Sequence, residues 1–295
     1  MSLEPHLVAK NLYYAECPRW HDSKLWFSDF FDHGIWTLDA EGTLERIHEV
    51  IGQPAGLGWM PDGTLVAVSM LDRTLLKSEG DELVEFADLE DMAAFHLNDM
   101  IVDSQGRCYV GNFGFDIYEF LAEEGMAALV EPPGPPTANI IMVNPDGSAK
   151  EVADELFFPN GMVITPDGKT FIVAETLAMR LSAFDIEPDG SLSNRREWAN
   201  LAHTYIAPDG ICMNQDGDIW VSNAIGPDCV LVAEGGKVVQ HVRTPDACFA
   251  CMLGGPDRRD LYMLCAPTSV AYMEHATNAG SIYMLKVEVP GVGLP

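Results

Sequence analysis

Four residues with oxygen donors recur at one position of a repeated sequence pattern. Glu16, Asn98, Asn160 and Asp209 each precede the middle of a short apolar run by 10 to 12 positions. Two carboxylates and two amide oxygens, without a thiolate, form a hard donor set that suits calcium, magnesium or manganese. If these side chains meet, the two like charges repel unless a divalent cation neutralises them. The pattern therefore predicts a metal site.

A second interpretation applies to each of these residues taken singly. Asn and Asp at the start of a strand often bond to nearby backbone groups and only cap the strand. Four polar residues in the same phase of four repeats favour the metal site over four independent caps.

The element that must position these residues is a β-hairpin, seen most clearly over residues 158–175. Asn160 is followed by the apolar run 162–164, by the turn Pro166-Asp167-Gly168, and by a second apolar run, 171–174. Two apolar runs joined by a Pro-Asp-Gly turn predict a hairpin with a functional group at its start.

The same hairpin recurs along the chain. Its second strand is expected at residues 25–28, 65–68, 108–111, 171–174, 219–222 and 261–264. From Trp26 to Tyr262 there are five intervals over 236 positions, or about 47 residues each, which is typical of propeller blades. We therefore predict an all-β fold, a single six-bladed β-propeller domain over residues 1–295 with a central metal site.

Radial packing of the blades brings the starts of the innermost strands together around one axis. Glu16, Asn98, Asn160 and Asp209 are therefore expected to converge. The second repeat has Pro54-Ala55 at this position, so that sector of the axis should be apolar, and the sixth has Phe249 in a looser match.

Two further segments complete the expected fold. Residues 119–138 begin with helix-permissive residues and end in a Pro/Gly-rich loop, so we expect an insertion that covers the mouth of the site. Segments 7–12 and 282–287 are expected to pair, because propellers often close by joining strands from the two ends of the chain.

Composition excludes several classes of partner. The formal net charge is −28, from 17 basic and 45 acidic residues, which disfavours nucleic acid and anionic membranes. The first residues lack an apolar segment typical of an export signal, and no run is long enough to span a membrane. Seven scattered cysteines predict reduced, structural thiols and a cytoplasmic location.

Several motifs together resemble the regucalcin/gluconolactonase/luciferin-regenerating-enzyme-like family over nearly the whole chain. The matching runs are Glu16-Cys-Pro-Arg-Trp, Asn98-Asp99 before Asp103-Ser-Gln-Gly, Pro159-Asn160-Gly161 before Pro166-Asp-Gly-Lys, and Pro208-Asp209-Gly210 before Trp220-Val. The resemblance implies a six-bladed propeller that holds one divalent metal and usually hydrolyses sugar lactones.

By this resemblance Glu16, Asn160 and Asp209 match metal ligands, and Asn98 matches a substrate-binding residue or further ligand. Calcium is the first expectation for the ion, with magnesium, manganese or zinc as alternatives. Gluconolactonase-like members often have an arginine two positions before the asparagine. This chain has His96 there, which favours another substrate.

Lactone opening needs a base for the attacking water and an acid for the leaving alkoxide. Asp209 is the first candidate base, and Asp99 and His96 are the other catalytic candidates. His96 is also a substrate-binding candidate, together with Asn98, Phe113, Phe115 and Tyr205.

Apolar residues are expected at the mouth, which favours a hydrophobic or aryl lactone or ester over a polyhydroxylated sugar. They are Phe30, Phe31, Met70, Phe95, Phe113, Phe115 and Leu177.

The sequence therefore predicts a metal-dependent lactonase or esterase that acts on a small molecule, as a monomer or weak homo-oligomer. The alternatives are a phosphotriester or phosphofluoridate hydrolase on the same metal, and a non-catalytic calcium-binding regulatory propeller. A condensing propeller resembling strictosidine synthase is disfavoured, because it would not require this set of acids and amides.

Overall fold

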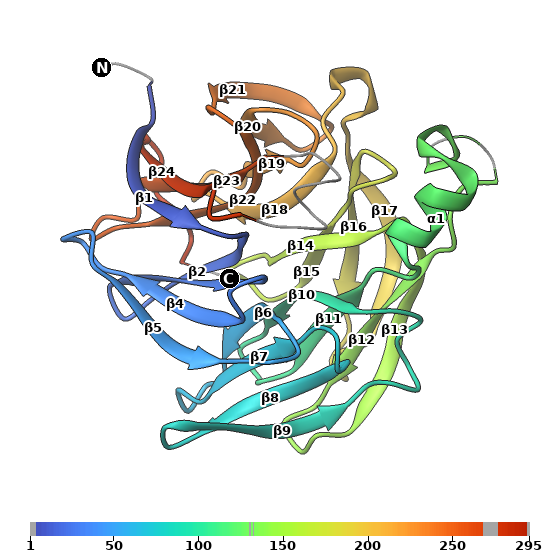
Figure 1. Ribbon diagram of the computed structural model, residues 1–295. Helices are drawn as coiled ribbons and strands as arrows, with labels where there is room; N and C mark the ends of the chain where they lie inside the picture. The colour runs from blue at the N-terminus through green and yellow to red at the C-terminus, as the bar shows by residue number, and fades with distance from the viewer. Residues whose placement is uncertain (1–3, 130, 132, 268–276, 294–295) are drawn as a thin grey trace.

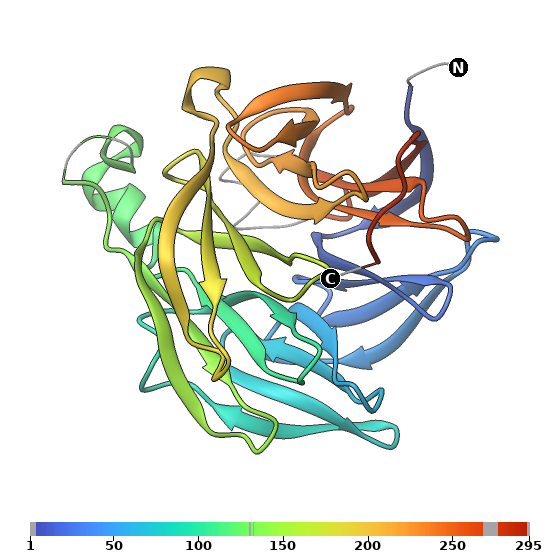
Figure 2. The same cartoon turned by 180° about the vertical axis from the view of Figure 1, so that it is seen from behind.

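Six four-stranded antiparallel sheets surround a central axis in the computed structural model, as Figures 1 and 2 show from opposite sides. The structure describes residues 4–129, 131, 133–267 and 277–293. The innermost strands are β2 (Ala15–His21), β6 (Pro54–Trp59), β10 (Leu97–Val102), β14 (Pro159–Ile164), β18 (Pro208–Met213) and β22 (Ala247–Gly254). The prediction of a six-bladed propeller is thereby confirmed.

The second strands coincide with the six apolar runs predicted from the repeat. They are β3 (Lys24–Asp29), β7 (Leu65–Ser69), β11 (Cys108–Asn112), β15 (Thr170–Glu175), β19 (Ile219–Asn223) and β23 (Asp260–Ala266). All residues of β14, β18 and β22 are buried. The inner strands therefore need apolar residues on both faces, which explains why they appear as apolar runs and not as alternating patterns.

The outer two strands of each blade complete the sheets. The third strands are β4 (Gly34–Leu38), β8 (Thr74–Glu79), β12 (Ala138–Val143), β16 (Arg180–Ile186), β20 (Asp228–Ala233) and β24 (Gly280–Lys286). The outermost are β5 (Leu44–Glu49), β9 (Glu82–Asp88), β13 (Ala149–Leu156), β17 (Leu192–Asn200), β21 (Lys237–Arg243) and β1 (His6–Leu12). Exposed residues alternate with half-buried or buried ones along β21, which leaves one face to solvent.

Blade six is closed by the two ends of the chain. β1 pairs antiparallel with β24, so that the sheet order is β1-β24-β23-β22. This confirms the expected pairing of segments 7–12 and 282–287. The closure covers an edge of β24 that would otherwise be free to pair with another chain.

The insertion in blade three forms a short helix that begins slightly earlier than expected. Helix α1 (Ile117–Glu124) starts at the N-cap Asp116, whose carboxylate accepts from the N–H groups of Tyr118 and Glu119. A 3₁₀ turn, Met126–Leu129, follows. Figure 1 shows α1 projecting at the outer edge of the propeller. The described part of the insertion therefore flanks the mouth and does not cover its centre.

Candidate functional site

Glu16, Asn98, Asn160 and Asp209 occupy the same structural position in four blades. Each is the second residue of its innermost strand. In each blade the strand register shifts within the next few residues, between Glu16/Arg19, Leu97/Met100, Pro159/Met162 and Pro208/Ile211. Such a bulge re-aims side chains and is frequent beside functional sites. The shared phase predicted from the sequence is therefore a shared backbone geometry.

The inner strands of these blades pack closely at this end of the axis. The Asn98 side chain donates from Nδ2 to the carbonyl oxygen of Pro159 at 3.3 Å. A Cβ atom on Gly161 would lie only 2.6 Å from the carbonyl oxygen of Asp209. Glycine is therefore needed beside Asn160, because the adjacent strand leaves no room for a side chain.

The two predicted ligand carboxylates are buried and influence each other electrostatically. Burial raises the pKa of Glu16 to about 8; the hydrogen bond from the N–H of Cys17 opposes this rise, and the charge of Asp99 adds to it. Burial, and then the charges of Glu16 and Asp99, raise the pKa of Asp209 well above its ordinary value. Like charges in a buried site disfavour ionisation. A divalent cation would relieve this repulsion, so the carboxylates fit such an ion.

The two amide side chains use their N–H groups and leave their oxygens available. Asn160 donates from Nδ2 to Oγ1 of Thr176 at 3.4 Å, and Thr176 donates to the carbonyl oxygen of Pro208. In the described part of the chain, neither Asn98 Oδ1 nor Asn160 Oδ1 has a hydrogen-bond partner. Oxygen is the donor that a hard cation requires.

Asp99 is held by an arginine that the sequence analysis did not single out. Nη2 of Arg19 donates to Oδ1 of Asp99 at 2.8 Å and also to the carbonyl oxygen of Met100. The same Asp99 oxygen accepts from the N–H of Met100 at 2.7 Å. The only sequence signal for this pair was the location of both residues within the two motifs that carry Glu16 and Asn98.

No group of three or more His, Cys, Asp or Glu side chains arranged to hold a metal occurs within the described ranges. The predicted ligand set contains only two carboxylates, and its other two members are amides. The third nearby carboxylate, Asp99, is engaged by Arg19.

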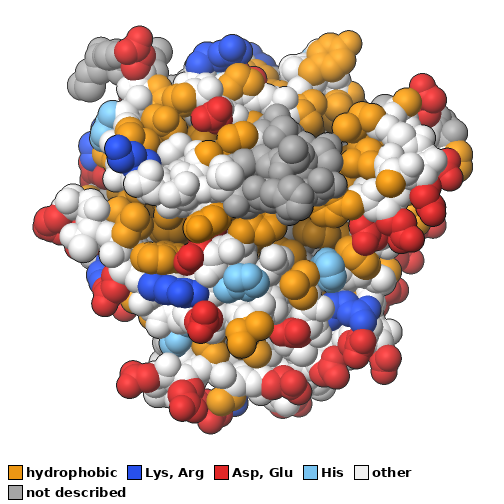
Figure 3. Space-filling model, in the orientation of Figure 1, with side chains coloured by type: hydrophobic (Ala, Val, Ile, Leu, Met, Phe, Trp, Pro, Cys, Tyr) orange, Lys and Arg blue, Asp and Glu red, His pale blue; other side chains and the backbone are white. Residues whose placement is uncertain are grey.

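His96 and Phe113 belong to a row of aromatic residues beside blade three. The His96 ring lies 4.0 Å from that of Phe95 and 6.4 Å from that of Phe113, which stacks on Phe158 at 4.9 Å. Burial lowers the pKa of His96 below its ordinary value, which favours the neutral imidazole. Figure 3 shows hydrophobic side chains gathered around the middle of this face and many acidic ones at its periphery.

Two other predicted substrate-binding residues, Tyr205 and Phe115, differ from this row in burial. Tyr205 ends a short 3₁₀ turn before β18 and is 77% exposed. Phe115 is buried against Phe120 of α1 and Phe158. Of the other apolar residues expected at the mouth, Phe30 and Met70 are also buried in the core. Residue type alone could not separate core aromatics from exposed ones.

Polar residues that end the second strands fix the loops leading into the inner strands. Asp29 accepts from the N–H groups of Tyr13 and Tyr14, and Asn223 accepts from Ala207. Glu175 accepts from the N–H of Phe157 at 3.0 Å. Each bond lies two or three residues before a predicted ligand. These bonds set where Glu16, Asp209 and Asn160 begin their strands.

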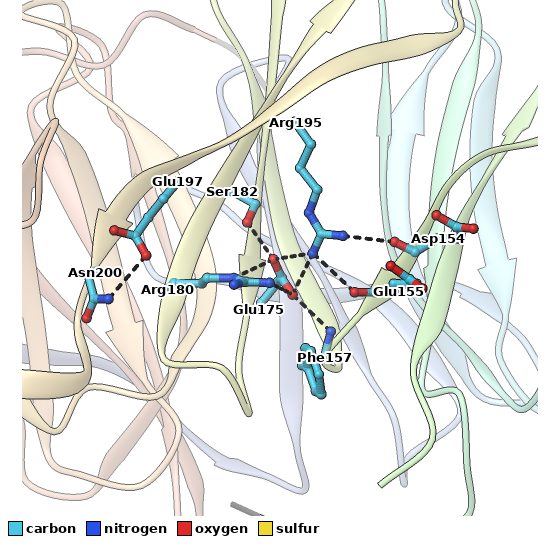
Figure 4. Close-up of polar contacts among 9 residues, drawn as sticks. All are labelled: Asp154, Glu155, Phe157, Glu175, Arg180, Ser182, Arg195, Glu197 and Asn200. Atoms are coloured by element: carbon cyan, nitrogen blue, oxygen red, sulfur yellow. Dashed lines mark hydrogen bonds and ion pairs between the residues drawn. The ribbon is translucent and has the colours of Figure 1, made fainter. Parts of the chain in front are cut away.

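Glu175 is the centre of the largest of these networks, shown in Figure 4. Its fully buried carboxylate pairs with Arg180 at 2.8 Å and Arg195 at 3.1 Å and accepts from Ser182. Burial alone would raise the pKa of Glu175, but the bonds from Arg180, Phe157 and Ser182 lower it overall.

A separate cavity of about 420 Å³ lies at the opposite end of the inner strands. Its lining includes Trp59, Val102 and Ile164, which are the last residues of β6, β10 and β14. None of the predicted site residues lines it. The C-terminal segment also lies at that end, where Val292 donates to the carbonyl oxygen of Met213.

The seven cysteines are free and buried, as expected for packed thiols. None of the helices in the described ranges has the length and apolar character needed to cross a membrane.

Six blades with acids and amides at the starts of four inner strands define a β-propeller with an oxygen-rich axial end. Residues 14–267 match the protein-family model described as the SMP-30/Gluconolactonase/LRE-like region. The chain belongs to this family, as the sequence motifs predicted.

Regucalcin of Bos taurus is 31% identical over 266 residues, which cover 88% of this chain and 85% of that protein. Two solved structures are similar in fold. A calcium-binding protein, regucalcin, from Agrobacterium tumefaciens has a TM-score of 0.77 at 18% identity and covers 98% of this chain and 94% of its own. A gluconolactonase from Xanthomonas campestris has a TM-score of 0.72 at 22% identity. The match covers 96% of this chain and 89% of the gluconolactonase.

Proposed function

We propose that this protein is a metal-dependent hydrolase that opens lactones, with one divalent ion held by Glu16, Asn98, Asn160 and Asp209. The observation that carries the proposal is the shared position of these four residues, two of them carboxylates with raised pKa values. Membership of a family whose description includes gluconolactonase supports the reaction class. Calcium is the proposed ion, because the donors are hard oxygens.

A divalent ion in this position would supply Lewis-acid polarisation of a carbonyl group and a lowered pKa for water. Asp209 is the proposed base, because its carboxylate is buried in the site and has no side-chain partner within the described ranges. Oδ1 of Asp99 already accepts two hydrogen bonds, so it is the weaker candidate. His96 is the third candidate and belongs to the aromatic row.

The proposed substrate is an aryl or alkyl lactone or a related ester. His96, Phe113 and Phe158 form an aromatic surface, and Phe31 and Phe113 are only partly buried. Apolar lining favours an apolar ligand, whereas a sugar lactone needs polar partners for its hydroxyl groups.

The test is turnover of a panel of lactones and phosphotriesters by protein stripped of metal and then supplied with single divalent ions. We expect restored activity with calcium and a higher kcat/KM for dihydrocoumarin than for gluconolactone. Phosphotriester turnover without lactone turnover would replace the proposed reaction, and preference for gluconolactone would reject the proposed substrate.

A non-catalytic calcium-binding role is the second candidate, because the related regucalcin from Agrobacterium tumefaciens is described as a calcium-binding protein. Calcium binding without turnover of any lactone or phosphotriester would favour it. We retain a cytoplasmic location and a monomer or weak homo-oligomer as proposals, the former because all seven cysteines are free.

A further inference from the structure

Arg19 links the two blades on either side of blade two. It lies on β2, three residues after Glu16, and its Nη2 donates to Oδ1 of Asp99 on β10 at 2.8 Å. Both side chains are only 5% exposed. Nη1 donates to the carbonyl oxygen of Pro18 at 2.8 Å, whereas Nε has no partner within the described ranges. A fully buried arginine is costly unless its charge is compensated nearby.

Blade two supplies no polar group of its own at this level. Its corresponding residue is Ala55, and a Cβ atom on Gly56 would lie 2.4 Å from the backbone nitrogen of Met100. The inner strand of blade two therefore lies tightly against β10. Asp99 belongs to this stretch of β10, and blade one supplies its counter-charge through Arg19.

The charges near the axis can be counted from these residues. Glu16 and Asp209, the two carboxylates among the four predicted ligands, carry three negative charges together with Asp99 when all three are ionised around a bound cation. Arg19 carries one positive charge, lies on the same strand as Glu16 and pairs with Asp99 at 2.8 Å. The sum is −3 + 1 = −2, which equals the charge that a divalent ion neutralises.

We propose that Arg19 is a permanent counter-cation that fixes the preference of the axial site for a divalent ion. This inference rests on the metal site of the proposed function. Arg19 is not a ligand in this proposal. It acts through the charge of Asp99 and through its field at Glu16. Removal of Arg19 leaves a charge of −3, which favours a trivalent ion.

The experiment compares the dissociation constants of Ca²⁺ and Tb³⁺, measured by calorimetry on metal-stripped protein. Arg19→Met removes the charge at similar length, and Arg19→Lys retains it. At an effective dielectric of about 20, a unit charge about 10 Å from a bound ion changes its dissociation constant by about tenfold for each unit of charge on the ion. We therefore expect Arg19→Met to raise the preference for Tb³⁺ over Ca²⁺ by about tenfold, and Arg19→Lys to leave it near the wild-type value.

The double variant Arg19→Met/Asp99→Asn is the matched control, because it removes both members of the pair and restores the sum to −2. We expect its Tb³⁺-to-Ca²⁺ ratio to return to the wild-type value. Asp99→Asn alone leaves −1 and should lower the ratio below wild type. This order would not result from a merely structural role, because the double variant loses the same hydrogen bonds as the single ones.

An unchanged ratio in folded Arg19→Met, or a double variant whose ratio stays high, overturns the inference. Circular dichroism establishes that each variant is folded. If Arg19→Met does not fold, the ratio in the double variant relative to Asp99→Asn decides, and equal ratios overturn the proposal. Failure of wild-type protein to bind either ion would instead reject the metal site, so the two proposals fail in different measurements.

Discussion

Asp209 and Glu16 are two buried carboxylates with different proposed roles: both bind the ion, and Asp209 also acts as the base. Glu16 accepts the N–H of Cys17 at 3.1 Å through Oε2, Asp209 accepts from the backbone N–H of Gly210, and neither carboxylate has a side-chain partner in the described residues. Asp209→Asn keeps an oxygen ligand of similar shape but removes its basicity. We expect a loss of about 10²- to 10⁴-fold in kcat that saturating calcium does not restore, as for the removal of a general base. The measurement is kcat with metal occupancy determined by calorimetry.

Glu16→Gln is the matched comparison at the residue scale. Its loss should arise mainly from weaker ion binding, so raised calcium should recover a larger share of activity. Near-wild-type kcat in calcium-loaded Asp209→Asn would transfer the role of base to Asp99 or His96.

The raised pKa of Glu16 predicts an unusual pH dependence of stability in metal-free protein. The unfolded chain releases this proton near pH 4.5, but the folded chain holds it until about pH 8. Between these values the folded state binds more protons, so the contribution of Glu16 to stability falls as the pH rises. We expect the free energy of unfolding, measured by urea denaturation in EDTA, to fall less steeply with pH in Glu16→Gln than in wild type. Equal slopes would contradict the raised pKa.

At the scale of elements, the Glu175 network is expected to fix the loop that leads into β14. Its carboxylate joins Arg180 of β16, Arg195 of β17 and the N–H of Phe157. Glu175→Ala leaves two partly exposed arginines without their partner, so we expect a loss of about 2 to 3 kcal/mol, less than for a fully buried pair. Urea denaturation measures the loss.

Glu45→Ala is the control for this prediction, because it removes an exposed carboxylate from the surface pair with Lys24. Exposed pairs contribute little, since both charges remain solvated. A loss no greater in Glu175→Ala than in Glu45→Ala would show that the network does not stabilise the blade.

The sequence predicted the repeated elements well because each blade repeats the same local pattern. Asn160, for example, is fixed by adjacent apolar runs and a Pro-Asp-Gly turn, all within 18 positions. The Arg19–Asp99 pair joins residues 80 positions apart. Which partner a buried arginine finds depends on how blades pack, and no local pattern encodes that. Tyr205 likewise is exposed at the end of a 3₁₀ turn, in a left-handed conformation that residue type did not indicate.

At the scale of the whole molecule, pairing of β1 with β24 should control both stability and association. Removal of residues 1–12 would expose the edge of β24 and eliminate the buried contacts of Ala9 and Leu12. We expect a loss of more than about 2 kcal/mol, from apolar burial alone, together with self-association through the free edge. Removal of residues 1–5, which precede β1, is the control. Denaturation and light scattering measure the two effects, and equal behaviour of the two truncations would contradict the prediction.

The closure of blade six also has a consequence in time. His6 pairs with Met284, so the partners are 284 − 6 = 278 positions apart. At about 5 to 20 residues per second, a ribosome makes them roughly 15 to 55 seconds apart. The blades that carry Glu16, Asn98, Asn160 and Asp209 are all synthesised during this interval, before the ring can close. During synthesis, β1 therefore remains without β24, its strand partner in the described part of the chain, until the last blade has been made.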